Sequence, residues 1–230
     1  MLIYAHRGSS NKLPENTMEA FEKALDDKAD GIELDVQLSA DGIPVIIHDE
    51  NLKRLTGEDL WVKDLVLKDL YPLNVLDSGF KIPTLVEYLD WVSRTDLVTN
   101  IELKTSVFKY EGLIDSVAKL VRRYFIEDKI MISSFNHLSL KESKELLPSV
   151  RHAALEVSNL VAPEEYLANN GFEYYHPLFT TIDRDLVKTL DKHDIKINAW
   201  TVDSHEHAIK LKELGIEGII TNVPHDFINL

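Results

Sequence analysis

Cysteine is absent from this chain of 230 residues. Without it the protein has no disulfide, no thiolate nucleophile and no cysteine-ligated zinc site. A lack of disulfides is typical of proteins from a reducing compartment. Any bound metal must therefore be held by oxygen or imidazole ligands.

Long apolar runs and an excess of basic residues are absent too. No stretch approaches the ~18 apolar residues of a membrane-spanning helix, and a strand-like pattern begins at Leu2. We therefore expect no integral membrane segment, no signal peptide and a cytoplasmic location. The chain carries 25 basic and 39 acidic residues, a net charge of −14. Because this field repels polyanions, we expect no nucleic-acid or anionic-membrane partner. The sequence indicates no particular oligomeric state.

Short apolar runs alternate with amphipathic helical stretches, the pattern of repeated β-α units around a parallel sheet. The runs that read as strands are 2–6, 31–36, 43–47, 97–104, 129–134, 151–157, 172–175, 195–201 and 216–221. An Asp41-Gly42 turn signal joins the second and third runs, which we predict to form a hairpin. Without the third run, which is only the second arm of this hairpin, eight strands remain. They predict an α/β fold, a (β/α)8 TIM barrel, as a single domain over residues 1–230.

Two local patterns refine this plan. A capping residue three positions before a glutamate predicts helix starts at Asn16, Thr84 and Asp203. Residues 49–82 break the alternation, with leucines scattered among charges. We predict that they form a small insertion after strand 2, beside the C-terminal end of the barrel.

Carboxylates gather where the inward face of the barrel should be. Glu33 and Asp35 share one face of a strand because strand side chains alternate, and Glu102 ends the next barrel strand. Buried together, they would have to be protonated, salt-bridged or bound to a cation. An all-oxygen site favours Mg²⁺ or Ca²⁺ over zinc, so we predict one divalent cation. The alternative is an ion-pair network in which Arg7 and Lys104 neutralise the carboxylates.

The same strand ends carry cations and histidines. Arg7 and Lys104 place positive charge beside the predicted cation, which suits a bound phosphate. A Schiff-base role for Lys104 is disfavoured, because neighbouring carboxylates raise a lysine pKa and that chemistry needs a lowered one. His6 and His48 are the candidates for general acid and base. His48-Asp49 has a simpler alternative, a turn held by a side-chain hydrogen bond.

Three further side chains at predicted strand ends are candidates for the wall of a substrate pocket: Phe135, His176 and Trp200. Trp200 would offer an aromatic surface to a glycerol or sugar-like backbone. Burial of the tryptophan in the core is the alternative.

Together these motifs resemble one family. Ala5-His6-Arg7-Gly8, Pro14-Glu15-Asn16-Thr17, Gly31-Ile32-Glu33-Leu34-Asp35-Val36, His48-Asp49, Ile101-Glu102-Leu103-Lys104 and Trp200-Thr201-Val202 are similar, in kind and order, to those of small bacterial glycerophosphodiester phosphodiesterases. The resemblance implies a β/α barrel, a divalent cation and hydrolysis of small-molecule glycerophosphodiesters to sn-glycerol 3-phosphate and an alcohol.

By position, the resemblance assigns Glu33, Asp35 and Glu102 to the metal, His6 and His48 to acid–base catalysis, and Arg7 and Lys104 to the phosphate. We expect His6 to act first as base and a cyclic phosphate to form. At Asp203 the chain departs from the family, which often has asparagine after Trp-Thr-Val, and we expect this aspartate only to cap a helix.

Two other functions stay open. One is a lysophospholipase D-type phosphodiesterase, which an apolar groove in residues 49–82 would favour. The other is a non-catalytic barrel that binds a metal or ligand, against which the presence of both His6 and His48 argues.

Overall fold

The structure, a computed structural model, describes residues 1–228 and 230. Within this part of the chain the strands are β1 (Leu2–His6), β2 (Gly31–Leu38), β3 (Pro44–Ile46), β4 (Val98–Leu103), β5 (Ile130–Ser134), β6 (Arg151–Glu156), β7 (Tyr174–Pro177), β8 (Lys196–Ala199) and β9 (Gly218–Thr221). The α-helices are α1 (Met18–Asp26), α2 (Lys53–Thr56), α3 (Leu67–Leu70), α4 (Leu85–Val92), α5 (Leu113–Tyr124), α6 (His137–Leu146), α7 (Pro163–Asn170), α8 (Arg184–Asp191) and α9 (His205–Leu214). None of these helices has the length and apolar character needed to cross a bilayer.

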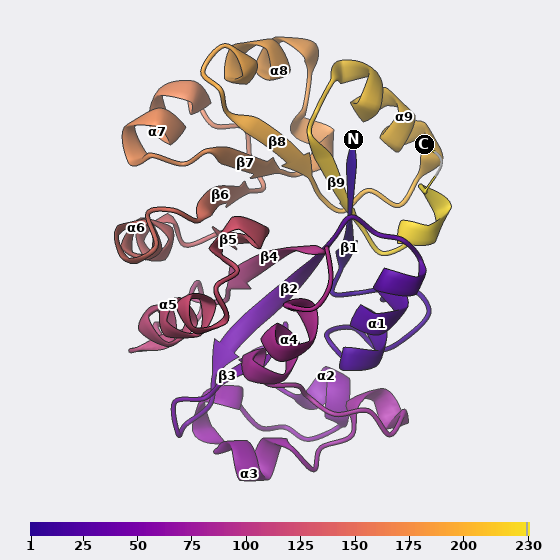
Figure 1. Cartoon of the computed structure of the whole chain (residues 1–230), viewed down its shortest axis with the longest axis vertical. Helices are drawn as coiled ribbons and strands as arrows, with labels where there is room; N and C mark the ends of the chain where they lie inside the picture. The colour runs from indigo at the N-terminus through magenta and orange to yellow at the C-terminus, as the bar shows by residue number, and fades with distance from the viewer. Residues whose placement is uncertain (229) are drawn as a thin grey trace.

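Eight of the described strands form a closed parallel barrel. They follow one another in the order β1-β9-β8-β7-β6-β5-β4-β2, and β2 pairs back onto β1. The larger helices lie around the outside of the barrel (Figure 1). The predicted (β/α)8 fold is therefore confirmed.

β3 is the second arm of the predicted hairpin. It pairs antiparallel with the end of β2, with Val36 opposite Ile46 and Leu38 opposite Pro44. In the turn, Gly42 has a φ of 77°, which glycine adopts without a steric penalty. The hairpin extends β2 beyond the barrel and leads directly into residues 49–82.

The main hydrophobic core lies between the outer face of the barrel and the helices. On β2, Ile32, Leu34 and Val36 are fully buried in this core. The alternating residues Glu33 and Asp35 consequently face the barrel interior. Strand alternation alone thus directs two acidic side chains inward.

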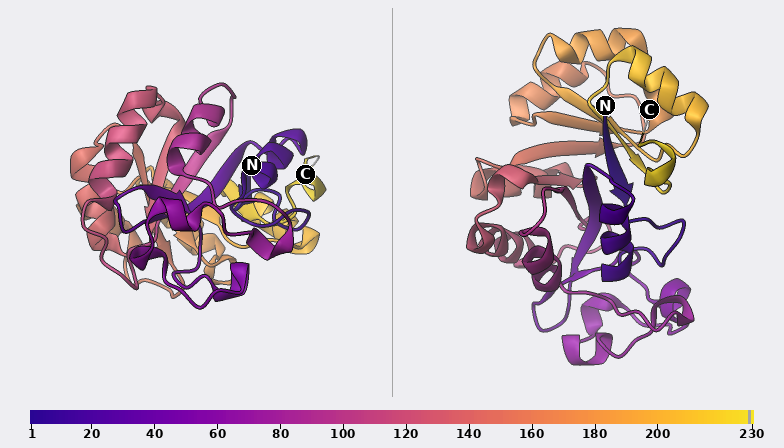
Figure 2. Two further views of the ribbon diagram at one scale, coloured as in Figure 1. Left: turned by 90° about the horizontal axis from the view of Figure 1, so that it is seen from below. Right: turned by 45° about the vertical axis from the view of Figure 1, so that its right-hand side comes forward.

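Residues 49–82 build a small layer with its own apolar centre at one end of the molecule (Figure 2). Leu52, Leu55 and Leu70 of this segment are buried against Val45 and Ile47 of the hairpin region. The predicted insertion is confirmed, and its scattered leucines form a packed cluster because the chain folds back on itself.

The predicted helix starts have mixed outcomes. At α4, Thr84 and Glu87 form the predicted capping box, with Thr84 N donating to Glu87 Oε2 at 2.7 Å. α1 begins one residue late, since Thr17 rather than Asn16 accepts the capping bond from Ala20 N.

The prediction for Asp203 is wrong. The residue before α9 is Ser204, and the Asp203 carboxylate instead accepts hydrogen bonds from Thr221 and Asn222. The strand predicted at 172–175 also lies two residues later, as β7.

Candidate active site

The three carboxylates predicted to bind a cation meet at the C-terminal ends of neighbouring strands. Asp35 on β2 stands opposite Glu102 on β4 in the strand register, and Glu33 precedes Asp35 on the same face. One oxygen from each carboxylate lies within 4.8 Å of the other two. All three side chains are buried.

Burial and mutual repulsion set the charge of this cluster. Desolvation, followed by the charges of Asp35 and Glu102, raises the pKa of Glu33 well above its usual value. Desolvation and Asp35 likewise raise the pKa of Glu102 to about 7. Burial also acts to raise the pKa of Asp35, but Arg7 and Lys104 outweigh it, and that pKa falls. A full set of negative charges is therefore costly here without a further cation.

Arg7 and Lys104 form the ion pairs that the alternative interpretation requires. Arg7 Nε lies 3.1 Å from Asp35 Oδ2, and Lys104 Nζ lies 3.1 Å from Glu102 Oε1. Two cations do not offset three carboxylates, however. Asp35 Oδ1 lies 3.8 Å from Lys104 Nζ and is buried without a hydrogen bond from any described residue. Because this all-oxygen donor set is under-neutralised and has an acceptor without a hydrogen bond, it fits a bound Mg²⁺ or Ca²⁺.

His6, at the end of β1, is held at one ring nitrogen. Its Nδ1 lies 2.7 Å from Asn222 Oδ1, and its Nε2 lies 3.9 Å from Glu33 Oε2. Burial, reinforced by the charge of Arg7, lowers the pKa of His6 to about 4. The imidazole is therefore neutral near pH 7 and has one nitrogen able to accept a proton.

His48, just after β3, has a charged partner instead. Its Nδ1 lies 2.7 Å from Asp49 Oδ1. Burial alone would raise the pKa of Asp49, but hydrogen bonds from Arg54 and His48 lower it to about 2. An ionised aspartate can only accept a hydrogen bond, so Nδ1 of His48 is the donor in this contact. The contact fixes the orientation of the His48 ring.

Arg54, on α2 of the insertion, hydrogen-bonds both the aspartate that contacts His48 and the glutamate that contacts Arg7. Its Nε donates to Asp49 Oδ2 at 2.6 Å, and its Nη2 donates to Glu15 Oε1 at 2.7 Å. Glu15 also accepts a 2.8 Å hydrogen bond from Arg7 Nη1. Sequence reasoning missed Arg54 because its glutamate partner lies 39 residues away along the chain.

Replacing Arg54 with methionine should lower kcat on the order of 10-fold, since Arg54 orients both His48, through Asp49, and Arg7, through Glu15. Steady-state kinetics of the variant measure this. Lys53→Met is the matched control, because Lys53 is exposed and forms its one described ion pair with the exposed Asp59. An R54M enzyme that is folded and has unchanged kcat would contradict the orienting role.

A cavity of about 110 Å³ opens at this end of the barrel and is lined by His6, Arg7, Glu33, His48, Asn100, Glu102, Phe135, Leu155, Trp200, Thr201 and Ile220. Phe135 and Trp200 meet edge to face, with ring centroids 5.4 Å apart, and form an aromatic wall. Lys104 is not part of the lining; its ammonium group lies against Glu102.

His176 does not line this cavity, so that prediction is wrong. Its side chain is fully buried inside the barrel, with Nε2 3.0 Å from Asn198 Nδ2. The physical reason is the strand boundary. β7 continues to Pro177, and Leu178 pairs with Trp200, which leaves His176 one layer below the aromatic wall.

Comparisons with known proteins agree with this geometry. The sequence model of the glycerophosphoryl diester phosphodiesterase family matches residues 6–226. The chain belongs to this family. A glycerophosphodiester phosphodiesterase of Caldanaerobacter subterraneus is 38% identical, over 100% of this chain and 97% of its own. Another, from Bacillus altitudinis, is 37% identical over 96% of this chain and 94% of its own.

Solved structures of the family have the same fold. A phosphodiesterase of Oleispira antarctica, in complex with the product sn-glycerol-3-phosphate, superposes with a TM-score of 0.93 at 28% identity, covering 98% of this chain and 94% of its own. The Thermotoga maritima glycerophosphodiester phosphodiesterase gives 0.83 at 29% identity, covering 99% and 97%. The enzyme class of this chain is accordingly glycerophosphodiester phosphodiesterase.

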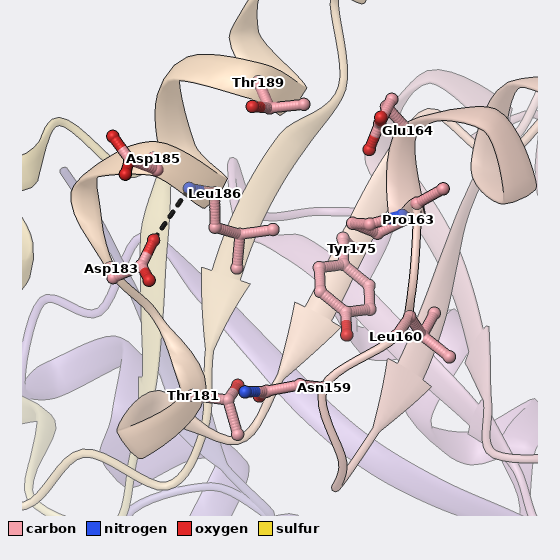
Figure 3. Close-up of a pocket in the computed structure, with 11 residues that line it drawn as sticks. Asn159, Leu160, Pro163, Glu164, Tyr175, Thr181, Asp183, Asp185, Leu186 and Thr189 are labelled. Atoms are coloured by element: carbon pink, nitrogen blue, oxygen red, sulfur yellow. Dashed lines mark hydrogen bonds between the residues drawn. The ribbon is translucent and has the colours of Figure 1, made fainter.

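A larger cavity of this phosphodiesterase lies elsewhere on the same end of the barrel. It measures about 340 Å³ and opens between α7 and α8, with Tyr175 and Glu164 on one side and Asp183 and Asp185 on the other (Figure 3). Its lining, which lies wholly in the described part of the chain, includes no histidine, lysine or arginine. Of these two cavities, only the smaller one is lined by the basic groups that suit phosphodiester chemistry.

Proposed function

We propose that this phosphodiesterase hydrolyses glycerophosphodiesters, such as glycerophosphocholine or glycerophosphoethanolamine, to sn-glycerol 3-phosphate and an alcohol. The observation that carries the proposal is the meeting of an arginine, a carboxylate cluster and two histidines in one cavity. The product bound to the Oleispira antarctica relative, sn-glycerol-3-phosphate, supports the same product here. The family match over residues 6–226 supports one catalytic domain.

In this proposal Glu33, Asp35 and Glu102 hold one Mg²⁺ or Ca²⁺. When bound, the cation supplies positive charge to the phosphate oxygens, which become more negative in the transition state. Arg7, in the cavity wall, contacts the same phosphate, and Lys104 adds a second fixed charge from behind Glu102. Phe135 and Trp200 pack against the organic part of the substrate.

The two histidines move the protons. His6 Nε2 takes the proton of the glycerol 2-hydroxyl, whose oxygen forms a bond to phosphorus while the bond from phosphorus to the alcohol oxygen breaks. His48 gives its proton to the departing alkoxide. Water then opens the cyclic phosphate with the roles reversed, yielding glycerol 3-phosphate. The neutral His6 and the aspartate-paired His48 support this order of roles.

A substrate that lacks the glycerol 2-hydroxyl should bind but scarcely react. Its phosphate still meets the positive charges of the site, whereas the internal nucleophile is missing. Measuring the inhibition constant and the turnover of a 2-deoxy analogue tests this. Hydrolysis at a rate comparable to glycerophosphocholine would rule out the cyclic intermediate and make one histidine the activator of water.

A second function, hydrolysis of lysophospholipids, is favoured by one observation. Apolar side chains that follow the strand ends on the cavity side are exposed, namely Val107 after β4, Leu138 after β5, and Val157 and Val161 after β6. They offer a surface to an acyl chain. A human lysophospholipase D is 26% identical over 98% of this chain.

A substrate panel distinguishes these functions. We expect glycerol 3-phosphate to be released from glycerophosphocholine and glycerophosphoethanolamine with a higher kcat/KM than the corresponding cleavage of lysophosphatidylcholine. The reverse ranking would make the lysophospholipid the substrate. If no phosphodiester of the panel is cleaved with either cation present, the chain is a non-catalytic barrel and the proposed function is wrong.

A further inference from the structure

Asp203 and Asn222 form a hydrogen-bonded unit directly behind His6. Asn222 Nδ2 donates to Asp203 Oδ2 at 2.7 Å, and Asn222 N donates to Asp203 Oδ1 at 2.8 Å. Thr221 Oγ1 donates to Asp203 Oδ1 at 2.9 Å. Asp203 is thus hydrogen-bonded to the end of β9 and the residue after it, and Asn222 of this segment contacts His6.

The Asp203 carboxylate decides which way the Asn222 amide points. An ionised carboxylate only accepts hydrogen bonds, so the amide must turn its NH₂ group toward Asp203 and its oxygen toward His6. The reversed amide would place two acceptors face to face. The same oxygen also accepts a 2.9 Å hydrogen bond from Ser10 Oγ, which agrees with this orientation.

The amide orientation in turn decides the tautomer of His6. Asn222 Oδ1, at 2.7 Å, can only accept, so Nδ1 of His6 must carry the ring proton. A neutral imidazole with its proton on Nδ1 has its lone pair on Nε2, the nitrogen that lies on the side of Glu33.

We propose that Asp203 and Asn222 are positioning residues that hold His6 with its proton on Nδ1, which leaves Nε2 free to accept the proton of the substrate hydroxyl. This rests on the proposed role of His6 as base. It gives a function to Asp203, where the chain departs from the asparagine frequent in the resembled family. An asparagine here would require a carboxylate in place of the Asn222 amide to keep the donor–acceptor order.

The tautomer is measured directly by long-range ¹H–¹⁵N NMR of the ¹⁵N-histidine-labelled enzyme near pH 7, with and without Mg²⁺, and the His6 signals are assigned from the spectrum of the His6→Gln variant. We expect protonated Nδ1 and unprotonated Nε2 in the wild-type enzyme. A protonated Nε2 would overturn the inference whatever the activity. This measurement needs no folded variant at Asp203 or Asn222 and does not depend on the substrate.

Kinetics of a reciprocal exchange test the positioning role. D203A should lower kcat roughly 10-fold, with KM changed far less, and should mix the two tautomers of His6. N222D should lower kcat at least as much, because two carboxylates then face each other. The double variant D203N/N222D restores one amide and one carboxylate. We therefore expect it to recover kcat above N222D and to keep the proton on Nδ1.

Asp183→Ala is the matched control. Asp183 is an exposed carboxylate that caps α8 by accepting a hydrogen bond from Leu186 N at 2.8 Å, and it lies at the same end of the barrel. Its loss should change neither kcat nor the His6 tautomer. The inference is overturned if folded D203A matches the wild type in kcat and in the His6 tautomer. It is also overturned if the kcat of the double variant is no higher than that of N222D. Loss of His6 without effect on kcat would instead refute the proposed base, while the tautomer result would stand.

Discussion

Removing divalent cations from the enzyme should abolish turnover, and Mg²⁺ or Ca²⁺ should restore it. The reason is the carboxylate cluster, in which Glu33 and Glu102 have raised pKa values because three acids share one buried site. A metal supplies several kcal/mol of transition-state stabilisation, which corresponds to more than about 10²-fold in rate. Release of glycerol 3-phosphate after exhaustive chelation measures the loss. Cation at 100 times its Kd should also stabilise the fold by about 2.7 kcal/mol.

Variants separate the cation site from general salt effects. Glu33→Gln should lower turnover by a similar factor and remove the rise in melting temperature on adding Mg²⁺. Glu22→Gln, on the exposed face of α1, should retain both. Full activity in a thoroughly metal-stripped wild-type sample would refute the site.

Replacing either His6 or His48 with alanine should lower kcat by roughly 10²-fold or more, the usual scale for a positioned acid or base. KM should change much less, because in the proposed site Arg7, Lys104 and the cation bind the phosphate. Steady-state kinetics with glycerophosphocholine measure both constants.

His193→Ala is the control for these variants, since His193 is exposed at the end of α8 and bonds the carbonyl oxygen of Thr189. It should leave kcat unchanged. Near-normal kcat in both the His6 and the His48 variants, with the fold intact, would show that other groups move the protons.

Strand alternation explains how much of this site the sequence could predict. Glu33 and Asp35 sit two residues apart in an apolar strand, so their shared inward face followed from local geometry alone. Glu102 could be assigned to the same cluster because barrel strands that follow each other in the sequence also pair in space. These steps use short-range rules, and the structure places all three side chains together.

The parts that sequence reasoning missed depend on contacts across the fold. His6 meets Asn222, 216 residues away, and no local pattern indicates that pairing. Asp203 matched a local capping pattern, but its long-range hydrogen bonds to Asn222 displaced the cap. His176 was misplaced because a two-residue error in a strand boundary shifts a side chain by one layer of the barrel.

The packing of residues 49–82 also depends on contacts that the local sequence does not indicate. Leu52 and Leu55 have no clear periodicity, because their partners come from the hairpin and from later turns of the same segment. Arg54 lies between them on α2 and therefore points back toward Asp49 and Glu15 as a consequence of that packing. These contacts depend on the folded segment and not on any local sequence pattern.

The proposed cation site holds one ion among Glu33, Asp35 and Glu102, beside Arg7. Anomalous diffraction from crystals soaked with Mn²⁺, which shares the oxygen preference of Mg²⁺, tests it most directly. We expect one strong anomalous peak with an oxygen of each carboxylate within about 2.0–2.6 Å. No peak there, in crystals of protein that is active with Mn²⁺ in solution, would contradict it.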